Sequence, residues 1–195
     1  MCVPELSFVG RWRGRFGVLM LCLAATACTE AATADATPLA VAGSPAEPPA
    51  LLLPVKGVVP GDLRDTFSDG RDDHQRGHEA IDMAAPRGTP VLAALDGRIV
   101  KLFLSKPGGI TIYQFDTTGQ FAYYYAHLER YADGLAEGQT VRRGNVIGYV
   151  GSSGNANPAG PHLHFAINRM APGEKWYHGT AVNPYPLLAG KPASR

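Results

Sequence analysis

The sequence predicts a mainly β domain built on an antiparallel sheet. Runs of β-branched and aromatic residues alternate with short turns that contain glycine or proline, which is typical of strands joined as hairpins. Two of these turns are only four or five residues long, too short for the crossover that a parallel sheet needs. The 23 glycines and 16 prolines also favour many turns over a helical bundle.

The order of strands follows from where the apolar runs begin and end. Strands are expected at residues 90–104, 110–116, 121–128, 144–151 and 162–168. The segments 105–109 and 117–120 are the hairpin turns, and 152–161 is a loop of small residues. One helical turn is expected near residues 128–138, so the architecture remains mainly β with loops long enough to build a site.

The overall composition is that of a single globular domain with extra segments. Eighteen Lys and Arg residues balance 17 Asp and Glu residues, for a formal net charge of +1, and no long basic run occurs. This charge distribution excludes the electrostatic pattern of a nucleic-acid binder. Nothing in the sequence sets the oligomeric state, and we expect a monomer.

The first 27 residues are predicted to be a secretory signal rather than part of the fold. Arg11, Arg13 and Arg15 precede an apolar run at 16–27 that ends in small residues, the pattern of an export signal. The run has 12 residues, whereas a helix that spans a bilayer needs about 20. We therefore expect export to the cell envelope.

Two cleavage sites compete at the end of this signal. Cleavage after Ala27 would release a soluble protein, whereas the Ala25-Thr-Ala-Cys28 sequence resembles a bacterial lipoprotein box without its usual leucine. The sequence favours the second, with Cys28 as the first mature residue and a lipid anchor to a membrane. Residues 28–54 are rich in Ala, Pro and Thr, which predicts a flexible linker before a domain at 55–195.

Five polar residues stand in an order that metal chemistry explains: His78 and Asp82, then His127, then His162 and His164. All three cysteines precede residue 29, so a metal in the folded part must be held by histidine and carboxylate ligands, which suit zinc. The last two histidines are two residues apart on a predicted strand, and their side chains therefore share one face. Any one of these histidines alone is more typical of a surface or core residue, but the joint pattern favours a site.

A catalytic zinc uses three nitrogen or oxygen ligands and leaves one position open. His78, Asp82 and His164 supply such a set, and the metal would lower the pKa of a water molecule to about 7, which makes it a nucleophile. The remaining His127 and His162 fit a base that accepts the water proton and a donor that stabilises the oxyanion. Up to this point the residues predict a metal hydrolase.

The segment 77–168 resembles the lysostaphin-type (LytM-like) family of zinc endopeptidases. The matching stretches, in the order of the family, are 77–91, 96–100, 125–128, 137–151 and 160–165. The resemblance implies an antiparallel β fold with a narrow active-site groove, and peptide cross-links or stem peptides of peptidoglycan as the substrate. It also implies that His78, Asp82 and His164 bind Zn²⁺ and that His127 and His162 form the catalytic pair.

Two positions depart from the family pattern, and one alternative function stays open. Ala80 replaces a frequent glycine and Ala166 a frequent glutamate, but neither is a ligand or catalytic position. Some relatives without zinc ligands only activate other wall hydrolases, so the alternative is a non-catalytic wall-binding or amidase-activating module. Tyr123 and Tyr125 alternate in line with His127, and we expect them either to line the site or to pack in the core.

Overall fold

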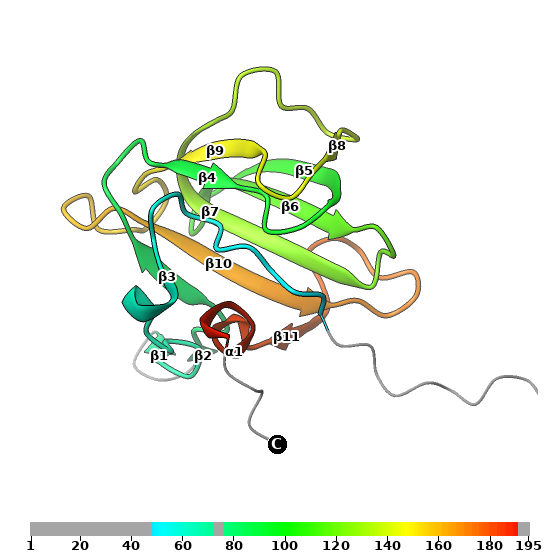
Figure 1. The fold of residues 1–195 in the computed structure, drawn as a ribbon, viewed down its shortest axis with the longest axis horizontal. Coiled ribbons are helices and arrows are strands. Elements are labelled where there is room, and N and C mark those ends of the chain that lie inside the picture. Colours follow the sequence, from blue (N-terminus) through cyan, green and yellow to red (C-terminus); the bar gives the residue numbers. More distant parts are fainter. Residues whose placement is uncertain (1–47, 72–75, 191–195) are drawn as a thin grey trace, which may run out of the picture. The chain divides into compact units, whose positions relative to one another are not determined.

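A computed structural model describes residues 48–71 and 76–190 (Figure 1). All of them belong to one compact unit, Gly43–Arg195. The predicted signal at 1–27, the anchor at Cys28 and the linker up to residue 47 lie outside the described residues, and they stay predictions. Within the described ranges, no helix is both long and apolar enough to cross a membrane.

The fold is an antiparallel sheet of nine strands, which confirms the predicted mainly β class. The strands are β3 (Ile81–Ala84), β4 (Pro90–Leu92), β5 (Gly97–Ser105), β6 (Gly109–Asp116), β7 (Phe121–Tyr131), β8 (Thr140–Val141), β9 (Val146–Val150), β10 (His162–Arg169) and β11 (Thr180–Val182). Their main order is β11-β10-β7-β6-β5-β8, while β3 pairs with β10 and β9 pairs with β7 and β4. The short strands β1 (Gly70–Arg71) and β2 (Arg76–Gly77) form a separate pair.

Helical structure occurs elsewhere than predicted. Residues 128–138 do not contain a helical turn, because β7 continues through Tyr131, paired with β9, and the chain then turns. Among the described residues, the helices are the 3-10 turn η1 (Pro60–Asp62) and α1 (Pro184–Ala189). Asn183 caps the N-terminus of α1, where its side chain accepts a hydrogen bond from the Tyr185 amide, and Gly190 caps the C-terminus in a left-handed conformation.

Strand β10 separates the core from the predicted site. Leu163 and Phe165 are fully buried in the hydrophobic core, and the alternation of side chains along a strand places His162 and His164 on the opposite face. Figure 1 shows β10 between β7 and β3, and the strand register sets His164 beside Asp82 of β3. The sheet thereby brings together residues that are 82 positions apart in sequence.

The folded contacts begin before residue 55. The amide of Leu52 donates to the carbonyl of Ala94, and the amide of Leu92 donates to the carbonyl of Pro54. Segment 51–54, which composition groups with the linker, is therefore held against the edge of the sheet, and Leu51 and Leu53 pack against the core.

Candidate metal centre

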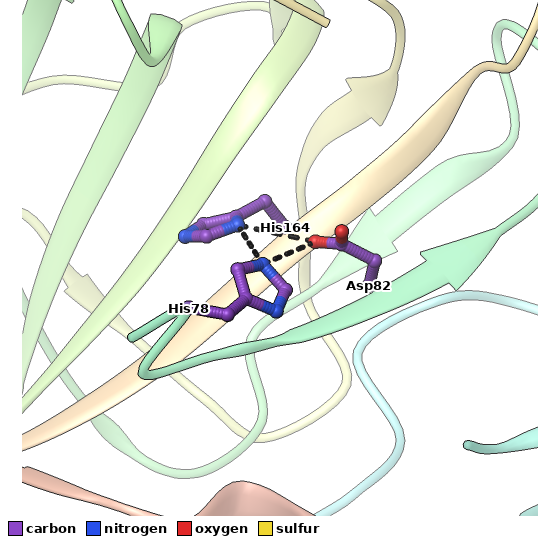
Figure 2. Close-up of side chains that lie close together, drawn as sticks. All are labelled: His78, Asp82 and His164. Atoms are coloured by element: carbon purple, nitrogen blue, oxygen red, sulfur yellow. Dashed lines mark hydrogen bonds and ion pairs between the residues drawn. The ribbon is translucent and has the colours of Figure 1, made fainter. Parts of the chain in front are cut away.

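Three side chains from separate elements converge on one point (Figure 2). His78 follows β2, Asp82 lies on β3 and His164 lies on β10. The His78 Nε2 atom is 3.0 Å from both the Asp82 Oδ1 atom and the His164 Nδ1 atom. The His164 Nδ1 and Asp82 Oδ1 atoms are 3.1 Å apart. These residues are the predicted metal-binding set, and the fold places them together.

The size of this triangle fits a tetrahedral zinc ion. Ligand bonds of about 2.0–2.1 Å in tetrahedral geometry place neighbouring donor atoms about 3.4 Å apart, close to the 3.0–3.1 Å separations found here. Two imidazoles and one carboxylate are also the donor types that zinc prefers. The residues present therefore fit the ion that the family resemblance implies.

His78 is held in the orientation that a ligand needs. Its Nδ1 atom lies 2.9 Å from the Thr66 carbonyl oxygen, which can only accept a hydrogen bond, so Nδ1 carries the proton. The Nε2 atom then presents its lone pair to the centre. The His78 side chain is 2% exposed, so burial as well as the hydrogen bond limits its motion.

The Asp82 carboxylate is ionised at the centre. Burial alone would raise its pKa, but the imidazoles of His164 and His78, each within 3.1 Å of its Oδ1 atom, favour the charged form and hold the pKa of Asp82 well below its usual range. A negative ligand next to two imidazole donors favours a divalent cation at this point.

The other two predicted histidines lie beside this triangle. The ring centroid of His127 is 5.0 Å from that of His162 and 5.6 Å from that of His164. The Nδ1 atom of His127 donates to the Ser153 carbonyl at 2.8 Å, and that of His162 donates to the Gly160 carbonyl at 2.9 Å. In the neutral rings each Nε2 atom therefore carries a lone pair that can accept a proton.

His127 lies in a β-bulge of β7. Its φ of 59° is in the left-handed region, which non-glycine residues rarely adopt. The pairing with β6 shifts at this point, because Tyr125 lies opposite Ile112 whereas Leu128 lies opposite Ile110. Strand β7 thus has one residue more than its partner, and the bulge turns His127 toward the metal ligands. Strained backbone of this kind is common at functional sites.

The bulge also decides which tyrosines lie near the centre. Tyr123 and Tyr125 are fully buried in the core, so of the two expectations for this pair core packing is confirmed. Instead Tyr124 approaches His164, with ring centroids 5.9 Å apart in an edge-on arrangement. Burial raises the pKa of Tyr124, which keeps its hydroxyl protonated. Sequence alternation from His127 points to the wrong tyrosines because it assumes a regular strand.

Burial lowers the pKa of His127 to about 4, from 6.5 for a free side chain. Between about pH 6.5 and pH 4, His127 binds a proton in the unfolded chain but not in the folded chain. Acidification through this range therefore favours unfolding. We expect the free energy of unfolding of the zinc-free protein to fall by at most about 3 kcal/mol from this residue between about pH 7 and about pH 4.5. Urea denaturation of wild type and His127→Asn at both pH values measures this free energy. The variant should lose less stability on acidification than wild type does. An equal loss in both proteins would contradict the assignment.

Comparison with known proteins adds independent findings. Residues 76–184 match the family model of Peptidase family M23. The chain is 36% identical over 131 residues to the L-Ala--D-Glu endopeptidase of Bacillus subtilis, which covers 64% of this chain and 39% of that protein. It is 39% identical over 116 residues to the DD-carboxypeptidase/endopeptidase Mpg of Neisseria meningitidis, covering 59% of this chain and 24% of that protein.

The fold is also similar to that of a solved structure. The catalytic domain of lysostaphin from Staphylococcus simulans is similar with a TM-score of 0.54 and 28% identity, over 66% of this chain and 94% of that domain. By contrast, the chain spans less than two fifths of the length of each of these two curated relatives. The similarity is thus to a catalytic domain that occurs within longer proteins.

Proposed function

The chain belongs to peptidase family M23, and we propose that it is a zinc metalloendopeptidase that hydrolyses peptide bonds in the cross-links or stem peptides of bacterial peptidoglycan. The observation that carries the proposal is the convergence of His78, Asp82 and His164 within 3.0–3.1 Å of one another. Two relatives of the chain are an L-Ala--D-Glu endopeptidase and a DD-carboxypeptidase/endopeptidase, which supports a peptide bond as the substrate.

In this proposal the chain contributes a ligand set and a pair of proton carriers. His78, Asp82 and His164 hold the ion, which supplies Lewis acidity that activates water and polarises an amide carbonyl. His127 and His162 form the catalytic pair, because their Nδ1 atoms are engaged by carbonyl oxygens and their Nε2 atoms can accept a proton. An imidazole that has accepted the water proton becomes a donor, suited to stabilise the oxyanion or to protonate the leaving amine.

Digestion of purified cell-wall sacculi tests this function. We expect zinc-loaded protein to release soluble muropeptides, a chelator to stop the release, and added zinc to restore it. Mass spectrometry of the muropeptides before and after digestion identifies the bond that is cut. Metal-loaded protein that binds sacculi but leaves every peptide bond intact would favour the alternative, a non-catalytic wall-binding or amidase-activating module.

We also propose how the domain reaches its substrate. The signal at 1–27 would direct export, and a lipid on Cys28 would anchor the linker and the folded domain after it at a membrane of the cell envelope. The apolar run and the cysteine after a small-residue site support this. The mass of the mature N-terminal peptide tests this anchor, because a lipidated Cys28 is heavier than an unmodified one. A peptide that begins upstream of Cys28 would contradict the proposed cleavage and lipidation.

A further inference from the structure

The segment just before β1 contacts two of the metal ligands through a single residue. The Thr66 carbonyl accepts the Nδ1 proton of His78 at 2.9 Å. The Thr66 Oγ1 atom accepts a hydrogen bond from the backbone amide of Asp82 at 3.2 Å. Thr66 is half-buried. One residue thereby orients the ring of one ligand and fixes the backbone of another.

The Asp82 amide needs such a partner because of where its strand lies. Strand β3 pairs with β10 on one side, and in the described sheet no second strand pairs with it. A backbone amide on the open side of an edge strand has no ladder acceptor, and leaving it without one in a partly buried place costs about 1–3 kcal/mol. The Thr66 hydroxyl fills this role, and it also points to the Ala80 carbonyl at 3.4 Å.

The residues after Thr66 hold the same stretch of chain. The amide of Glu79 donates to the Phe67 carbonyl, and the amide of His78 donates to the Asp69 carbonyl, both at 2.9 Å. Glu79, between the two ligands, has a φ of 53°, a strained value for a residue with a side chain. Segment 66–69 therefore runs along segment 78–82 and holds it through these hydrogen bonds.

This arrangement is connected to the C-terminal helix. The Asn183 Nδ2 atom donates to both Asp65 carboxylate oxygens, at 3.2 and 3.3 Å. Asn183 is also the residue that caps α1. The position of Thr66 is thus set from two directions, by the helix cap through Asp65 and by the hydrogen bonds to segment 78–82.

We propose that Thr66 is a positioning residue of the metal centre: its hydroxyl preorganises the backbone at Asp82, its carbonyl orients His78, and both contacts raise the affinity for zinc. The proposal rests on the metalloenzyme function proposed above. Groups that orient metal ligands without touching the ion typically change affinity by 10- to 100-fold when they are removed. Thr66 does this for two ligands at once, because they are four residues apart on the segment that it holds.

Zinc affinity of three variants tests the proposal, measured by competition with a chromogenic chelator. We expect Thr66→Val, which keeps the side-chain shape and removes the hydroxyl, to weaken zinc binding about 10- to 100-fold. Thr66→Ser, which keeps the hydroxyl, should retain affinity close to wild type. Thr118→Val is the matched control, because Thr118 Oγ1 accepts from the Gln120 amide at the same 3.2 Å in the turn before β7. It should bind zinc like wild type.

Circular dichroism establishes that each variant is folded before titration. If Thr66→Val does not fold, Thr66→Ala replaces it with the same expected direction. Wild-type affinity in a folded variant without the hydroxyl would overturn the proposal, as would an equal loss in Thr118→Val. Wild-type protein that binds zinc and leaves sacculi intact would instead contradict the proposed function and leave the role of Thr66 standing.

Discussion

Replacing His164 with alanine should abolish zinc binding and peptide-bond hydrolysis together. The His164 Nδ1 atom is within 3.0–3.1 Å of both other donor atoms, so its loss leaves only two protein ligands. A catalytic zinc site needs three. Because the metal contributes several kcal/mol to transition-state stabilisation, hydrolysis should fall by about 1,000-fold or more. Atomic absorption measures the zinc per chain, and muropeptide release measures the activity.

His178→Ala is the control for a histidine outside the centre. His178 is exposed in the loop between β10 and β11, where its ring contacts Tyr177. This variant should keep about one zinc per chain and full activity. A His164→Ala protein that still held zinc and digested sacculi like wild type would rule out the ligand set and with it the proposed chemistry.

The spacing of residues predicted the metal centre because it depends on two short, regular patterns. His162 and His164 share a face on any strand, and the strand at 162–169 is regular. His78 and Asp82 are close in sequence, so a turn and the start of β3 suffice to bring both to the centre. The family resemblance then supplied the long-range contact between these segments, which spacing alone cannot give.

Features that depend on an irregular strand or on contacts between distant residues could not be predicted from the sequence. The bulge at His127 shifts the side-chain alternation by one residue, so Tyr124 and not Tyr125 lies beside His164. The role of Thr66 depends on contacts with residues 12 and 16 positions later, which no local pattern indicates. Helix α1, in contrast, had readable signals in the Asn-Pro start and the glycine end, but two prolines within four residues also suit an extended segment.

Substitution of either catalytic histidine should separate hydrolysis from zinc binding. His127→Asn suits the left-handed backbone, because asparagine tolerates positive φ, and His162→Gln removes the second imidazole. Neither residue belongs to the donor triangle, so both variants should keep about one zinc per chain. Loss of a positioned proton carrier should lower kcat by about 100- to 10,000-fold, measured on an isolated cross-linked muropeptide.

The double variant shows whether the two histidines act as a unit. If both histidines serve one proton path between the water and the leaving amine, the second substitution should lower kcat little once the first has been made. The effects on kcat of residues that act together are strongly non-additive. The 5.0 Å separation of their rings makes such a shared path geometrically reasonable. Full hydrolysis by either zinc-loaded single variant would exclude that residue from the chemistry, and multiplicative losses would assign the two imidazoles to separate steps.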